Sequence, residues 1–69
     1  MKYIVIELQT NANGAVGNIV TSYDTLAAAE SKYHLVLSAA ATSTLPEHAA
    51  VLINSKGYLL ESKCYEHGE

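Results

Sequence analysis

The stretch of residues 25–42, TLAAAESKYHLVLSAAAT, decides the expected fold. Asp24 or Thr25 can cap a helix here, because a side-chain oxygen at that position accepts a hydrogen bond from a free backbone N–H group. Pro46 excludes helix just beyond the far end. We therefore expect a helix over about residues 25–41, with one apolar stripe at helical spacing formed by Leu26, Ala29, Tyr33, Val36, Leu37 and Ala40.

Two segments of strand-like composition precede this helix and two follow it. β-branched residues are concentrated in them, and turn signals separate the members of each pair: Asn13-Gly14 in the first and Asn54 to Gly57 in the second. The chain of 69 residues allows one domain, residues 1–69. We expect an α+β fold of ββαββ order, a four-stranded antiparallel sheet with one helix packed on one face. The expected strands are residues 2–9, 16–23, 48–55 and 58–66.

Strand order follows from where the most apolar strands lie. An order of 2-1-3-4 places residues 2–9 and 48–55 in the centre of the sheet, whereas 1-2-4-3 leaves them at its edges. Residues 48–55 carry apolar side chains on both faces, which favours a central strand. We therefore prefer 2-1-3-4.

One helix covers only one face of such a sheet, so the opposite face remains open. We expect Tyr3, Val5, Val51 and Ile53 to form an apolar patch there, larger than monomers usually expose. Such a patch predicts a homodimer or docking of another protein, and the alternative is a twisted sheet covered by its own loops. On the helix, Leu35 lies outside the core stripe and is a possible second contact.

Composition excludes several classes of function. The four lysines are scattered, arginine is absent and the net charge is −3, so no cationic patch for nucleic acid is expected. No apolar run is long enough to span a membrane, and the start is too short for a signal peptide. Cys64 is the single cysteine, so no disulfide can form within the chain. A free thiol without an export signal favours the cytoplasm, and no cofactor is expected.

Two groups of residues are candidates for chemistry. Cys64 and His67 lie three residues apart near the chain end, but that spacing on a strand points them to opposite faces unless the terminus bends. We expect His67-Gly68-Glu69 to fray. Glu30 and His34 lie one helical turn apart, which suits a hydrogen bond or two metal ligands.

Further metal ligands could come only from nearby residues. Glu47 and His48 are the nearest candidates to the Glu30 and His34 pair. Surface pairing is the simpler interpretation of Glu30 with His34, and His48 is expected to face solvent at the start of a strand.

The chain resembles a group of short uncharacterised proteins encoded by phages and prophages of gut Firmicutes, near tail and lysis genes. The residues that carry the resemblance are 2–7, 9–11, 18–21, 30–34 and 48–52. These relatives carry more acidic residues at the helix start and in a tail, where this chain has Ala27-Ala28-Ala29 and an early end. The resemblance implies a mobile-element origin and no mechanism.

These observations predict a small interaction or structural accessory module, self-associating through the open sheet face. The resemblance places it in the cytoplasm of a bacterial host or in a phage particle. The alternative function is a small metal- or thiol-dependent accessory enzyme that uses His34 and His48, or Cys64 and His67.

Overall fold

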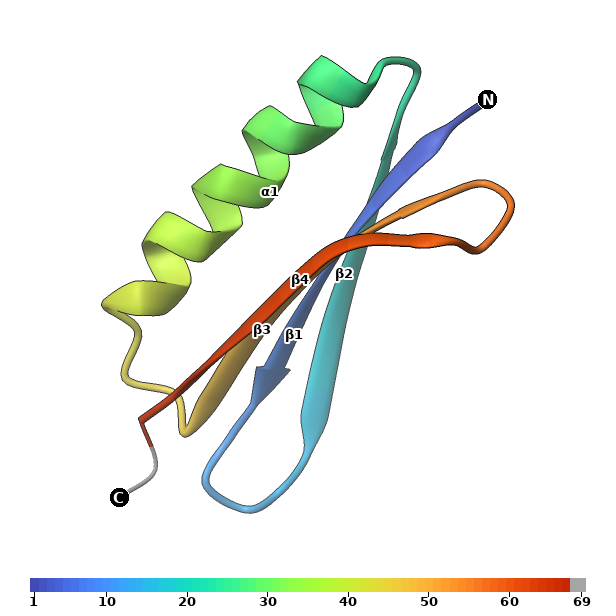
Figure 1. The fold of residues 1–69 in the computed structure, drawn as a ribbon. Helices are drawn as coiled ribbons and strands as arrows, with labels where there is room; N and C mark the ends of the chain where they lie inside the picture. Colours follow the sequence, from blue (N-terminus) through green and yellow to red (C-terminus); the bar gives the residue numbers. More distant parts are fainter. Residues whose placement is uncertain (68–69) are drawn as a thin grey trace.

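A four-stranded sheet and one helix make up the fold. The computed structural model describes residues 1–67, and the elements follow one another as β1 (Tyr3–Thr10), β2 (Val16–Tyr23), α1 (Leu26–Ala41), β3 (Glu47–Asn54) and β4 (Leu59–Glu66) (Figure 1). All neighbouring strands are antiparallel, in the order β2-β1-β3-β4. The predicted α+β class and strand order are therefore confirmed.

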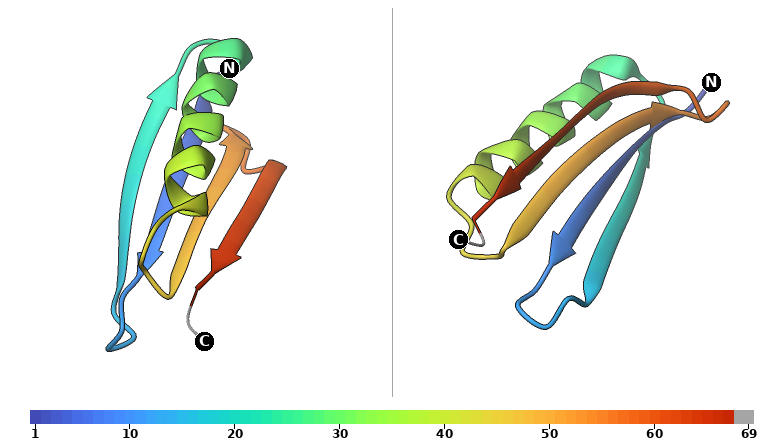
Figure 2. Two further views of the ribbon diagram at one scale, coloured as in Figure 1. Left: turned by 90° about the vertical axis from the view of Figure 1, so that its left-hand side faces the viewer. Right: turned by 60° about the horizontal axis from the view of Figure 1, so that its bottom comes forward.

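The helix runs along one face of the sheet. Figure 2 shows α1 on that face and no other segment of residues 1–67 on the opposite one. Thr25 caps the start of α1, since its Oγ1 accepts a hydrogen bond of 3.2 Å from the backbone N–H of Ala28. The helix ends at Ala41, where the backbone N–H of Thr42 turns back to the carbonyl of Ala39.

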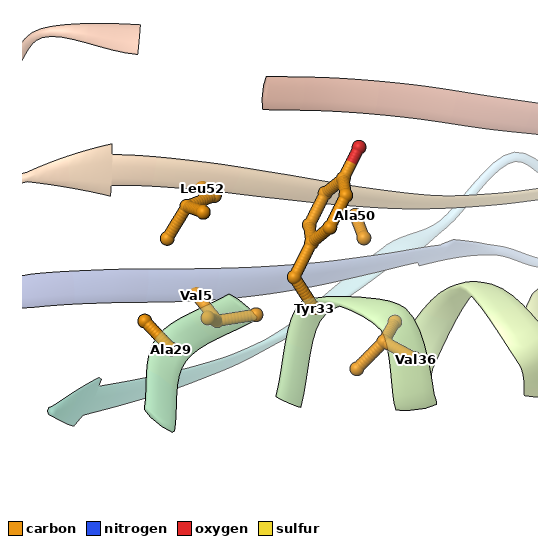
Figure 3. Close-up of a cluster of buried hydrophobic side chains, with 6 residues drawn as sticks. All are labelled: Val5, Ala29, Tyr33, Val36, Ala50 and Leu52. Carbon is orange, nitrogen blue, oxygen red and sulfur yellow. The ribbon is translucent and has the colours of Figure 1, made fainter. Parts of the chain in front are cut away.

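The core lies between α1 and the two central strands. Its side chains interlock across the layer, with the Tyr33 ring lying over β3 (Figure 3). Leu37 packs against this cluster from the helix, while Leu26 remains largely exposed. The buried cluster comprises Val5, Ala29, Tyr33, Val36, Ala50 and Leu52.

Asparagine side chains close both hairpin turns. Asn11 Oδ1 accepts from the backbone N–H groups of Asn13 and Ala15, at 3.2 and 3.1 Å. Asn54 Oδ1 does the same for Lys56 and Tyr58, at 2.9 and 3.1 Å, which explains why this polar residue is buried. The turns therefore carry their own hydrogen bonds and hold the strand pairs in register.

His67 hydrogen-bonds to the end of the helix and to the segment that follows it. The backbone N–H of His67 donates to the carbonyl of Pro46 at 2.7 Å, and its Nε2 donates to the carbonyl of Ala40 at 2.9 Å. The His67 ring also stacks on Tyr65. The expectation that residue 67 frays is therefore wrong, and Gly68 and Glu69 lie outside the described residues.

Candidate interaction surface on the open sheet face

The register between the central strands assigns each side chain to a face. Val5 pairs with Leu52, and Ile6 pairs with Val51. Directly paired residues of antiparallel strands point to the same side of the sheet. Because Val5 and Leu52 are buried beneath α1, Ile6 and Val51 point away from the helix.

The face away from the helix, called the open face here, is strongly apolar along its centre. Its central side chains come from alternate positions of β1 and β3, and all are only partly buried. Their pairs are Ile4 with Ile53, Ile6 with Val51, and Leu8 with Ala49.

Two of the four residues expected on the open face lie on the other side. Val5 is 1% exposed within the core, and Tyr3 packs against that core from the same side of β1. Both point toward α1 because their paired residues on β3, Leu52 and Asn54, do so. Placing Tyr3 and Val5 on the open face is therefore wrong, whereas Val51 and Ile53 lie on it.

The outer strands extend the apolar surface. Val20 on β2 pairs with Ile6 and is 58% exposed, and Leu59 on β4 pairs with Ile53 and is 61% exposed. The patch therefore crosses all four strands. Leu35 is 64% exposed on α1, away from this surface, so the structure does not join it to the open face.

The face beneath the helix, called the covered face here, contains a buried acid–base pair. Glu7 on β1 and His48 on β3 both point toward α1, and His48 Nε2 lies 2.6 Å from Glu7 Oε2. Gln9 Nε2 donates to the same oxygen at 2.9 Å. This contact gives Glu7 and His48 a hydrogen-bond partner each, in a place where burial removes water as a partner.

The surroundings of Glu7 favour its charged form. Burial on its own would raise the pKa of Glu7 above 4.5. The hydrogen bonds from His48 and Gln9 act in the opposite direction, as do the electrostatic interactions of Glu7 with His48 and Lys32. Together they outweigh burial, so the pKa of Glu7 is lowered.

His48 does not face solvent, contrary to the expectation. It is only 5% exposed, and its Nδ1 has no hydrogen-bond partner within residues 1–67. It is buried because it alternates with Ala50 and Leu52 on the helix-facing side of β3. Its environment favours a structural role with Glu7.

The structure does not bring the candidate chemical residues together. His34 is exposed on α1 and packs edge-on against Tyr33, whereas His48 lies beneath the helix. Cys64 shares the open face with Ala49, while His67 bonds to the helix end on the opposite side. Within residues 1–67, no group of three or more His, Cys, Asp or Glu side chains could hold a metal ion.

Sequence reasoning missed two features of these faces. Alternation along β1 places Ile4, Ile6 and Leu8 on one side of the strand, but alternation alone does not show that this side is open. Local sequence also does not pair Glu7 with His48, since the two residues lie 41 positions apart. The signal for Glu7 was its position two residues from Val5, which places the two side chains on one face.

Comparison with known proteins finds no matching protein family, curated protein or solved structure. α1, the one helix formed by residues 1–67, lacks the length and apolar character needed to cross a membrane. The candidate site of this chain is therefore defined by its own geometry, and the open face is its most prominent feature.

Proposed function

We propose that this protein is a small interaction module that works through the open face of its sheet and associates there with a second copy of itself. Neither catalysis nor a cofactor is part of this proposal. The partner would bury the apolar side chains that α1 leaves uncovered.

One observation carries the proposal: the uncovered face of the two central strands is more apolar than the covered one. The open face has five large aliphatic side chains on β1 and β3 and no charge near its centre. The covered face of the same strands includes Glu7, Gln9, His48 and Asn54. The five aliphatic residues are Ile4, Ile6, Leu8, Val51 and Ile53.

The size of the open face suits a small dimer interface. Four strands of eight residues, at ordinary strand spacing and rise, give an outline of about 19 by 27 Å. Two such faces together would bury about 1,000 Å², near the lower end of specific protein interfaces. Burial of this area would also add to the stability of a chain whose core is small.

The phage or prophage origin is part of the proposal and is supported by the resemblance described above. On that view the module is an accessory or structural component, acting in the bacterial cytoplasm or in the particle. Its interaction surface is independent of that origin, since it depends only on the open face.

A charged side chain placed at the centre of the open face tests the proposed dimer. We expect Val51→Glu to convert a dimer into a folded monomer, because Val51 is partly exposed and lies outside the buried core. The affinity should fall more than tenfold, seen as a rise in Kd, since a buried unpaired carboxylate is strongly unfavourable. Light scattering behind a sizing column, over a range of concentrations, measures the mass.

A matched control separates this effect from added charge alone. Ser38→Glu places the same charge on an exposed position of α1 and should leave the dimer intact. Circular dichroism checks that both variants stay folded. A wild-type protein that remains monomeric at all concentrations, or a V51E variant that remains dimeric, would remove the proposal.

A further inference from the structure

The two ends of the open face differ in charge. Glu47 and Glu66 are paired residues of β3 and β4 at one end, and both are exposed. Like charges directly opposite each other on a sheet are unfavourable unless a cation lies nearby. No salt bridge within residues 1–67 supplies that cation.

The opposite end carries the complementary charge. Lys56 lies in the turn that joins β3 to β4, at the far end of β3 from Glu47. Lys2 and Asp24, at the same end, already form an ion pair with each other. Lys56 takes part in no salt bridge within residues 1–67, so it is available to an anion on another molecule.

Two-fold stacking of the open faces allows two simple arrangements. If the axis runs across the strands, the ends exchange and the Glu47 and Glu66 end of each copy lies over the Lys56 end of the other. If the axis runs along the strands, the edges exchange instead: all four carboxylates lie at one end, β4 of each copy lies over β2 of the other, and no carboxylate lies near Lys56 of the partner. Coulomb attraction favours the first arrangement and opposes the second.

We propose that two copies stack with their strands antiparallel, so that Glu66 of each copy lies over Lys56 of the other. This inference rests on the proposed function, since it requires the open faces to meet. The apolar centre supplies the affinity and the charged ends select the orientation.

Charge reversal distinguishes the two arrangements, because only the first brings Glu66 and Lys56 of different copies together. In the proposed dimer Glu66→Lys places two lysines together at each end, and we expect Kd to rise about tenfold. Lys56→Glu should weaken the dimer similarly, and the double variant K56E/E66K should restore most of the affinity. In the other arrangement Glu66 lies over β2 of the partner and away from its Lys56, so E66K should not weaken the dimer.

Cross-linking tests the same orientation through geometry. Cys64 pairs with Ala49 and Leu59 pairs with Ile53, on either side of Val51. An axis across the strands at Val51 therefore places Cys64 of one copy over residue 59 of the other. Packed sheets lie about 10 Å apart, so a bismaleimide of about that length should join Leu59→Cys dimers covalently through Cys64.

Two control proteins complete the cross-linking experiment. In the other arrangement β4 lies over β2, and Cys64 would face Asn18, which pairs with Leu8 at the level of Ala49. Asn18→Cys should therefore not cross-link in the proposed dimer. Wild type should also yield little product, since its two Cys64 thiols lie four residues apart along the strands and on separate sheets.

The outcomes separate the two proposals. A monomeric wild type overturns the proposed function and this inference together. A dimer that E66K does not weaken, or that cross-links through N18C instead of L59C, overturns the orientation and leaves the proposed function intact. Weakening by E66K, recovery in K56E/E66K and cross-linking through L59C support the antiparallel stack.

Discussion

Glu7 and His48 form a polar pair on the covered face of the sheet, although the sequence predicts that His48 faces solvent. Both lie beneath α1, joined at 2.6 Å, with Gln9 bonded to the same carboxylate. A slip of β1 by one residue would turn Glu7 to the open face and leave His48 buried without this partner. The pair therefore favours one register of the central strands over its neighbours.

The lowered pKa of Glu7 predicts a loss of stability in acid. Its folded-state pKa lies below 4.5, so the unfolded chain binds its proton more readily as the pH falls. The stabilisation is fully present above the unfolded-state pKa and is lost as the pH falls through the folded one. We expect the free energy of unfolding of wild type to fall from about pH 5 to 3, measured by urea denaturation.

The Glu7→Gln variant is the control for this pH dependence. It retains Asp24, whose pKa is lowered by its hydrogen bond and ion pair with Lys2, so that contribution cancels in the comparison. The E7Q protein should lose less stability than wild type over the same pH range. Equal pH slopes for the two proteins would contradict the assignment.

Local signals were sufficient to locate the elements. Each strand and the helix begin and end within one residue of the expected range, because Thr25, Pro46 and the turn residues act on the backbone nearby. Strand order was also predictable, since the two most apolar strands gain most from central positions. These features depend on short stretches of chain.

The β3–β4 turn depends on Gly57, which has a φ of 85°. A side chain at that backbone conformation is strained, so we expect Gly57→Ala to lower the free energy of unfolding by about 1 kcal/mol. Gly17→Ala is the control: Gly17 lies in β2 outside the positive-φ region, and an added Cβ would meet only an ordinary contact at 3.9 Å. Gly17→Ala should change the free energy of unfolding by no more than about 0.5 kcal/mol. Chemical denaturation measures both variants.

Both variants change one methyl group in a hairpin, so only the backbone conformation separates them. Equal losses of stability in G57A and G17A would show that the turn does not require the positive φ at residue 57.

At the scale of the whole molecule, residues 1–67 form two layers, a helix and a sheet, and leave one face of the sheet open. One helix covers one face of the sheet, and the core beneath it includes one alanine from α1, Ala29, and one from β3, Ala50. A second sheet on the open face would complete the layer arrangement that usually buries a sheet. Folding and association are therefore expected to be linked in this protein.

This linkage predicts that thermal stability depends on protein concentration. A partner that binds only the folded chain stabilises it by mass action, so the Tm of wild type should rise by about 3 °C for each tenfold increase in concentration. Val51→Glu should show a Tm independent of concentration. Differential scanning calorimetry measures both, and a constant Tm for wild type would contradict the linkage.

The sequence by itself determined the elements, their order in the sheet and the grouping of alternate residues on each strand. It did not determine which side of β1 the helix covers. Ile4, Ile6 and Leu8 form the more apolar side, and yet Val5 and Tyr3 lie beneath α1 while that side remains open. The alternation of side chains along a strand separates two faces but does not show which one packs against the helix. Only the tertiary structure decides that, because the pairing of Val5 with Leu52 and the burial of Glu7 with His48 join residues far apart in the chain.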